Sequence, residues 1–282
     1  MEEKTLKQLE KQAEAIRESV IQMVEHAGSG HIAGPLGLAD ILTALYFRIL
    51  RHDPKDPSWS ERDIFIMSNG HCNPVLYAAM SHAGYFPKKE LLTLRQLGSR
   101  LQGHPERSAL PGLENTSGPL GSGLSQACGM ALALKIDQNK IRNIYITIGD
   151  GELNEGQNWE AIMLAAKYNL DNIVAIIDRN NIQIDGPAEQ VMPLESLKDK
   201  WLAFGWHVQE IDGHNIEAII DACAMARAVS GKPSVIIAHT IPGKGVEFME
   251  NDFRWHSGAP THPQALEALH DLRSLKGKIK YD

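Results

Sequence analysis

Two short polar motifs follow two apolar runs of the sequence. Gly149-Asp-Gly-Glu152 comes directly after Ile144-Tyr-Ile-Thr-Ile148, and Arg179-Asn-Asn-Ile182 comes after a second apolar run at 173–178. In a right-handed strand–helix–strand unit, both run ends lie at the same sheet edge, where open α/β sheets bind ligands. One carboxylate, one amide oxygen and one backbone carbonyl there would suit Mg²⁺ and leave coordination positions for phosphate oxygens and water. The two motifs together predict a metal–diphosphate site around Asp150 and Asn180.

Three other phosphate or metal motifs do not fit this segment. A P-loop would continue with Lys and Ser or Thr after Gly156, but Gln157-Asn158 follow. An EF-hand that began at Asp150 would need glycine and glutamate where the chain has Glu155 and Ala161. A dinucleotide-binding G-x-G-x-x-G follows none of the predicted strands. Each motif alone would be an ordinary turn, and only their combination at this spacing favours a metal site.

Histidines form the second set of candidate chemical groups. Of the twelve in the chain, four lie in Gly-rich or Pro-rich turns, namely His31, His71, His104 and His256. An imidazole that titrates near neutral pH can accept and return a hydroxyl proton. None of them has zinc-like spacing. The other eight have no motif support, so we expect them at the surface or at helix ends: His26, His52, His82, His207, His214, His239, His262 and His270.

The elements that must position these groups follow from the apolar patterning. Short β-rich runs at 64–67, 144–148, 173–178, 207–211 and 234–239 predict strands. Helical spacing predicts helices at 5–26, 36–50, 74–83, 88–97, 122–138, 155–168 and 215–229. Strands that alternate with helices indicate an α/β fold, a parallel sheet with helices on both faces. We expect one domain over 1–282, with a functional loop at about 240–263 that shows no clear period.

The bulk properties exclude several classes of protein. A net charge of −7 disfavours a nucleic-acid-binding surface. Three widely separated cysteines (Cys72, Cys128, Cys223) predict neither a disulfide framework nor a zinc site. The charged N-terminal residues do not resemble a signal peptide, and no apolar stretch is long enough to span a bilayer. We therefore expect a cytoplasmic protein without membrane contact.

With these motifs in place, nearly the whole chain resembles the transketolase family. The resemblance is carried by the Gly149–Gly186 segment, by the four histidine turns and by Thr116-Ser-Gly-Pro-Leu-Gly-Ser-Gly123. It implies the thiamine-diphosphate-binding fold, with Mg²⁺ as the metal and Ca²⁺ or Mn²⁺ as substitutes. By resemblance the metal ligands are Asp150, Asn180 and the carbonyl of Ile182. The cofactor contacts would be His71, Gly118, Leu120, Gly151, Asn180, Ile184 and His256.

The resemblance also implies roles in catalysis and assembly. His31, His104 and His256 would be catalytic, and His31 and His256 would hydrogen-bond the sugar. Glu155 and Glu160 match acidic positions at a contact between subunits. The chain departs from the family at Ile32, where a proline is usual, and this substitution removes a restraint on the turn that carries His31.

The implied function is transfer of a two-carbon ketol unit from a ketose phosphate to an aldose phosphate. The chain matches only the first of three transketolase domains, and the cofactor-activating glutamate of the family lies in the second. We therefore expect the partner to be a separate C-terminal transketolase subunit, in an α2β2 assembly. Two alternatives are an alpha subunit of a 2-oxo-acid dehydrogenase and a non-catalytic regulatory subunit on the same fold.

Overall fold

A five-stranded parallel sheet forms the centre of the molecule. The computed structural model describes residues 1–138 and 141–274. The strands run in the order β1-β2-β3-β7-β6, and each neighbouring pair is parallel. Their bounds are β1 Ile64–Met67, β2 Ile144–Gly149, β3 Ile173–Arg179, β6 His207–Asp212 and β7 Ser234–His239. The five predicted strands and their parallel arrangement are confirmed.

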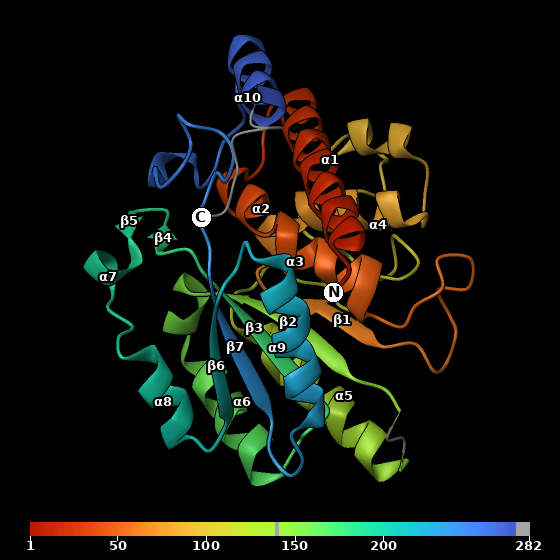
Figure 1. Ribbon diagram of the computed structural model, residues 1–282, viewed down its shortest axis with the longest axis vertical. Helices are drawn as coiled ribbons and strands as arrows, with labels where there is room; N and C mark the ends of the chain where they lie inside the picture. Colours follow the sequence, from red (N-terminus) through yellow and green to blue (C-terminus); the bar gives the residue numbers. More distant parts are fainter. Residues whose placement is uncertain (139–140, 275–282) are drawn as a thin grey trace.

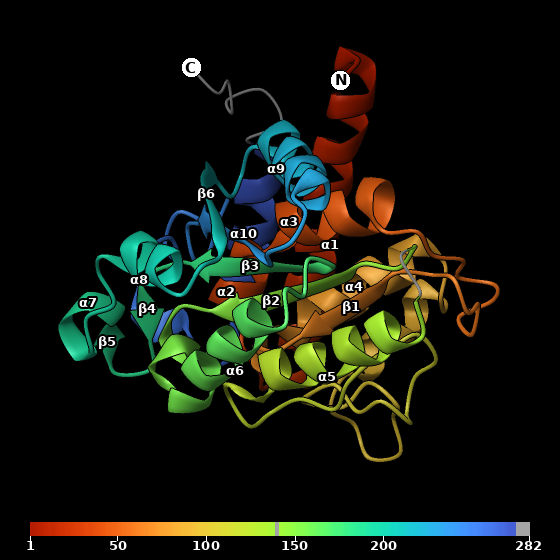
Figure 2. The ribbon, with the colours of Figure 1, turned by 90° about the horizontal axis from the view of Figure 1, so that it is seen from below.

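Helices cover both faces of this sheet, because successive strand residues point to opposite sides. Phe65 and Met67 of β1 join one apolar core, and Ile64 and Ile66 join the other. The first core is completed by α1 (Glu3–Ala27), α2 (Ala33–Gly37), α3 (Ala39–Ala44), α4 (Asn73–Ala83), α9 (Ile216–Ala228) and α10 (His262–Ser274). The second core is completed by α5 (Ser122–Ile136), α6 (Gly156–Lys167) and α8 (Leu197–Ala203). Figures 1 and 2 show the two layers, with α5 and α6 on the side of the sheet opposite α1 and α9.

Three predicted segments differ in the structure. The helix expected over 36–50 is divided into α2, α3 and a π-helical turn, Leu45–Ile49. The helix expected over 88–97 was wrong: only a 3-10 helix, Lys88–Thr93, forms, and Arg95 with φ 60° and Gly98 with φ 81° are left-handed positions that a helix cannot contain. The expected loop before residue 195 holds a hairpin, β4 (Ile182–Gln183) and β5 (Gly186–Pro187), and a short helix α7 (Ala188–Val191).

The carboxyl ends of four strands meet at one edge of the sheet. Short 3-10 helices follow β1 and β2, at Gly70–Cys72 and Gly151–Asn154. β7 leads into the segment at 240–261, whose regular structure is one 3-10 helix, Phe253–Trp255. None of the described helices combines the length and the apolar character needed to cross a membrane. The motif residues that follow β1, β2, β3 and β7 lie at this edge of the sheet.

Candidate active site

Asp150 directly follows β2 and is 1% exposed. Its Oδ2 accepts the Asn181 N–H at 2.6 Å and an Arg179 guanidinium N–H at 2.9 Å, and its Oδ1 accepts the Gly151 N–H at 2.7 Å. Burial raises the pKa of Asp150, and these three donors oppose the rise. Among the described residues Oδ1 has this one donor, so it retains capacity for a cation.

Asn180 and its neighbours lie at the end of β3, next to Asp150. The Asn180 Nδ2 donates to Asp178 at 2.8 Å, and its Oδ1 accepts the Ile182 N–H at 3.0 Å. Asn181 has φ 58°, a left-handed conformation that asparagine tolerates, and this turn presents its N–H to Asp150. The structure thus brings together the three residues that the sequence predicts as metal ligands.

The donor set at this point consists of hard oxygens. No three His, Cys, Asp or Glu side chains within the described residues gather as a metal site. A set of one carboxylate, one amide and one carbonyl suits Mg²⁺, which keeps open positions for phosphate oxygens, rather than zinc. These residues fit the implied metal.

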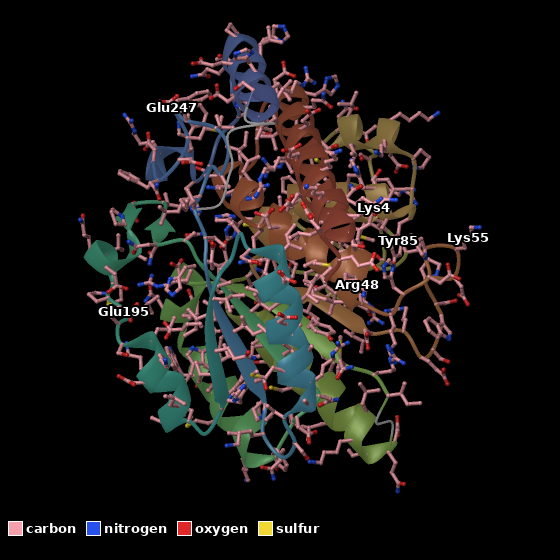
Figure 3. The ribbon with its side chains drawn as sticks, viewed as in Figure 1. Lys4, Arg48, Lys55, Tyr85, Glu195 and Glu247 are labelled. Atoms are coloured by element: carbon pink, nitrogen blue, oxygen red, sulfur yellow. The ribbon has the colours of Figure 1, made fainter. Side chains whose placement is uncertain are left out.

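Two residues beside the ligands were missed by the sequence reasoning. Asp178 is fully buried and accepts the Thr240 hydroxyl at 2.5 Å, and burial raises the pKa of its carboxyl to about 7. Arg179 joins Asp150 to two carboxylates beyond β5, Glu189 at 2.6 Å and Glu195 at 2.9 Å, the second of which is labelled in Figure 3. Both residues lie inside the Asp178-Arg-Asn-Asn run, so the motif was a signal that could have identified them.

Glu152 connects three loops of the site and was also missed. Its carboxylate is 3% exposed and accepts the Ser68 hydroxyl at 2.5 Å, the Gly121 N–H at 2.6 Å and the Gly149 N–H at 3.1 Å. Burial raises the pKa of this carboxyl. The ends of β1 and β2 and the start of α5 are therefore held to one another by a single side chain.

Three of the four histidine turns bring their rings together, and the ring of the fourth lies beside Gly118. The ring centroid of His31 lies 4.9 Å from that of His71 and 5.5 Å from that of His256, and the centroids of His71 and His256 lie 5.3 Å apart. His104 lies beside Gly118, where a Cβ would be 3.6 Å from the His104 Cγ. Burial lowers the pKa of His31 to about 4 and that of His71 to about 3. It also lowers the pKa of His104 and of His256. All four rings are therefore neutral at pH 7, with one N–H donor and one lone pair each.

Two buried polar atoms near these histidines have no hydrogen-bond partner among the described residues. They are Asn69 Nδ2 and Ser117 Oγ, on residues that are 1% and 4% exposed. Each immediately precedes a glycine of the pocket loops, and Gly70 packs so closely on Ser117 that a Cβ would lie 2.2 Å from its Oγ. Buried polar groups are normally paired. The loops that carry His71 and Gly118 therefore suit a polar ligand such as the implied cofactor.

The remaining predicted cofactor residues line the same sheet edge. Gly151 follows Asp150, and a Cβ there would lie 2.9 Å from the Gln183 side chain. Leu120 is 36% exposed and Ile184, in the β4–β5 turn, is 65% exposed. Two large apolar side chains at the rim are thus uncovered in the isolated chain.

The expectation of a surface or helix-end position for the eight other histidines was wrong for His214, whereas His82 lies in the last turn of α4. His214 is 5% exposed and bonds to Asp40 at 2.8 Å. His82 is half-buried and contacts Gln12 at 2.6 Å and Ser19 at 2.9 Å. His52 is also half-buried, with Tyr85 and the Tyr46 carbonyl as partners. These partners come from distant or non-periodic positions, so no local pattern marked these rings as internal.

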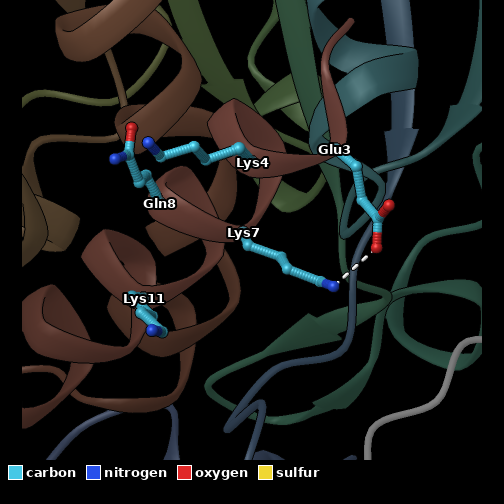
Figure 4. Close-up of a pocket in the computed structure, with 5 residues that line it drawn as sticks. All are labelled: Glu3, Lys4, Lys7, Gln8 and Lys11. Carbon is cyan, nitrogen blue, oxygen red and sulfur yellow. Dashed lines mark hydrogen bonds and ion pairs between the residues drawn. The ribbon is translucent and has the colours of Figure 1, made fainter.

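Two hollows are lined by none of the four motif histidines or the proposed metal ligands. Figure 4 shows one of about 410 Å³ on α1, whose five lining residues all come from the exposed face of that helix and include the Lys7–Glu3 ion pair at 2.5 Å. The second, of about 320 Å³, lies between the residues after β2, α6 and α8, with Trp159 and Phe204 in its lining. Neither contains a residue predicted to do chemistry.

Comparisons with known proteins agree with this geometry. Residues 9–277 match the family model described as the thiamine diphosphate binding domain of transketolase. The chain is 46% identical over 264 residues to the 6-deoxy-6-sulfo-D-fructose transketolase subunit of Clostridium sp. (strain MSTE9), covering 94% of this chain and 96% of that protein. It is 44% identical over 272 residues to one of the subunits of the apulose-4-phosphate transketolase of Phocaeicola vulgatus, covering 96% of each.

A solved structure shows the same similarity in three dimensions. The transketolase of Campylobacter jejuni subsp. jejuni matches with a TM-score of 0.87 at 38% sequence identity. The match covers 94% of this chain and 42% of that one. The chain thus spans less than half of that solved transketolase.

Proposed function

The chain belongs to the transketolase family, as its thiamine-diphosphate-binding part, and from this premise we propose that it is the cofactor-binding subunit of a two-chain transketolase. The reaction is transfer of a two-carbon ketol unit between a ketose phosphate or related anionic ketose and an aldose phosphate. The observation that carries the proposal is the convergence of Asp150, Asn180 and four histidine turns at one sheet edge. The relatives that this chain covers almost fully are themselves named as transketolase subunits.

In this proposal the sheet edge holds Mg²⁺ and the diphosphate. Asp150, Asn180 and the Ile182 carbonyl bind the metal, and Ca²⁺ or Mn²⁺ can substitute for it. Gly151 presents its backbone to the diphosphate, and His71, Gly118, Leu120, Ile184 and His256 contact the rest of the cofactor. The chemistry that the cofactor supplies when bound is an electron sink for cleavage of a carbon–carbon bond.

The histidines bind the sugar and move its hydroxyl protons. His31 and His256 hydrogen-bond the substrate, and His104 lies near its terminal hydroxyl. The lowered pKa values of these rings support this assignment, because a neutral ring has a free lone pair for a hydroxyl proton at pH 7.

An anionic sugar fits the charge at the pocket mouth. Arg95 is exposed, and its positive charge contributes to lowering the pKa of both His31 and His104. Within the described residues it has no carboxylate partner. Ile32 is fully buried in the larger apolar core, so its extra bulk is accommodated there. We therefore propose a phosphorylated or sulfonated ketose as donor.

A partner chain would cover the apolar rim next to the site. The outer face of α5 carries small exposed residues, Ser125, Gly129 and Ala133, and the adjacent α6 exposes Met163 at 51%. Ile184, in the β4–β5 turn, is also exposed, at 65%. We propose that the chain carrying the remaining transketolase domains docks here as an α2β2 assembly, with Glu155 and Glu160 at the contact.

The three buried free thiols suit a reducing cytoplasm.

The alternatives are weaker on specific grounds. The relatives named above are transketolase subunits, which favours transketolase over a 2-oxo-acid dehydrogenase. A complete set of hard-oxygen ligands with four neutral histidines favours a catalytic role over a regulatory one.

The test is reconstitution with the candidate partner. The chain, the partner, thiamine diphosphate and Mg²⁺ are mixed, and ketol transfer is followed with xylulose 5-phosphate, apulose 4-phosphate and 6-deoxy-6-sulfofructose as donors. We expect activity only when both chains and the metal are present, and none with Asp150→Ala. Full activity from this chain alone, or no calorimetric binding of cofactor and Mg²⁺ by the mixture, would contradict the proposal.

A further inference from the structure

A buried charged network joins α1, α3 and the residues before α9. Asp40 of α3 is 3% exposed and accepts two guanidinium N–H groups of Arg17 of α1, one of them at 3.2 Å. Arg17 also donates through Nε to the Leu36 carbonyl at 3.0 Å. Burial alone would raise the pKa of Asp40, but Arg17 and His214 hold it below its usual range. The network therefore presents a fixed carboxylate to the ring of His214.

His214 connects this network to the segment after β7. Its Nδ1 lies 2.8 Å from Asp40 Oδ2, and the Ile241 N–H donates to its Nε2 at 2.8 Å. Because a backbone N–H can only donate, Nε2 carries the lone pair and the ring proton is on Nδ1, facing the carboxylate. One neutral tautomer satisfies both contacts.

The segment that begins at Ile241 is the one that carries His256. Farther along, the Gly243 N–H donates to the Ala33 carbonyl at 2.8 Å, and the Gly258 N–H donates to the Gly30 carbonyl at 2.7 Å. These contacts place the segment alongside the turn of His31, and the His31 and His256 rings lie 5.5 Å apart. The start of the segment is thus attached through two buried side chains, Asp178, which accepts the Thr240 hydroxyl, and His214, which accepts the Ile241 N–H.

We propose that His214 is a positioning residue, which together with Asp40 and Arg17 fixes the start of segment 240–258 so that His256 faces His31. This role rests on the proposed function, since it concerns the geometry of the proposed sugar-binding pair. His214 itself touches none of the four histidines of the cluster among the described contacts. It acts through the backbone of Ile241.

Two substitutions separate the contacts of the ring. His214→Gln places a carbonyl oxygen near the position of Nε2 and can still accept the Ile241 N–H. His214→Asn places an amide near the position of Nδ1, so it can contact Asp40 but not Ile241. His82→Gln is the matched control, because that ring is also internal and hydrogen-bonded, but to α1 side chains.

The experiment combines hydrogen exchange of the full chain with kinetics of the reconstituted enzyme. For His214→Asn we expect faster amide exchange across 240–258, a ~10–100-fold fall in kcat and a raised KM for the sugar, with Mg²⁺ affinity unchanged. We expect His214→Gln to show a smaller change than His214→Asn, because it loses the Asp40 contact but keeps the Ile241 contact. We expect His82→Gln to stay near wild type.

Two results would overturn the proposal: unchanged exchange over 240–258 in His214→Asn, or equal defects in the Asn and Gln variants. If the wild-type pair shows no ketol transfer, the proposed function fails, and the exchange measurement still decides whether His214 holds the segment.

Discussion

Gly123, in the first turn of α5, provides the sharpest test of how tightly the site loops are packed. A Cβ at this position would lie 2.4 Å from Ser68 Oγ and 2.9 Å from Ser68 Cα. Carbon atoms in contact are normally ~3.5–4.0 Å apart, so Gly123→Ala forces the end of β1 and the start of α5 apart. The same shift breaks the Ser68 hydroxyl contact to the buried Glu152 carboxylate.

The size of the effect follows from three contributions. Overpacking costs ~1–3 kcal/mol, and loss of a hydrogen bond to a charged group costs ~1.5–3 kcal/mol. The better helix propensity of alanine offsets ~0.5–1 kcal/mol of this. We therefore expect Gly123→Ala to lower the free energy of unfolding by about 3 kcal/mol.

Gly129, in the same helix, is the matched control. No atom lies within 4 Å of the position that its Cβ would occupy. Gly129→Ala should therefore raise the free energy of unfolding by ~0.5–1 kcal/mol through propensity alone. Urea titration of the isolated chain measures both variants, with the slope of the transition unchanged. If the two variants shift the midpoint in the same direction, the close packing of Gly123 on Ser68 is refuted.

Three further predictions concern the metal, acid stability and the partner. For Arg179→Gln we expect the ~10–100-fold loss of Mg²⁺ affinity that is typical of an outer-shell partner, and for Asp150→Asn a larger loss. Calorimetry of the reconstituted complex measures both affinities, and equal affinities would contradict the ligand assignment. Burial, with Lys88, lowers the pKa of His82 to about 4. In the unfolded chain this ring takes up a proton near pH 6.5, whereas in the folded chain it does so only near pH 4. The free energy of unfolding therefore has its full value above about pH 6.5 and decreases as the pH falls toward 4. His82→Gln should therefore lessen the loss of stability between pH 7 and pH 5 in urea titrations, and an unchanged loss would count against the buried ring. Gly129→Arg should leave the isolated chain folded but prevent assembly with the partner in sedimentation experiments, whereas normal assembly would exclude α5 from the interface.

The sheet and the proximity of Asp150 to the Asn180 turn were predictable because both depend on local signals. Fully buried strands such as Ile144–Gly149 are continuous apolar runs, and the motif residues follow them directly along the chain. The neighbours of those residues were harder to predict. Glu152 looked like part of a turn, yet its three partners come from β1, β2 and α5.

Side-chain contacts between residues that are distant in the sequence could not be predicted from the sequence pattern. Asp40 and His214 are 174 residues apart, and nothing near either one indicates that they pair. The helix expected over 88–97 failed for a different reason, because helical spacing does not report the left-handed backbone at Arg95. Sequence periodicity reports which face is buried, but not which polar groups are brought together by the packing.

The order of strands has a consequence for how the chain emerges from the ribosome. Among the described residues β7 is the last strand along the chain, yet it lies between β3 and β6. Until residues 234–239 are synthesised, the growing chain has no strand to place between β3 and β6. Pairing of β3 with a strand so distant in the sequence is slow. Thr240 and Ile241, which contact Asp178 and His214, follow within two residues of that strand. Closure of the sheet and attachment of the segment that carries His256 thus belong to one late step of synthesis, so ribosome-bound chains shorter than this point lack both.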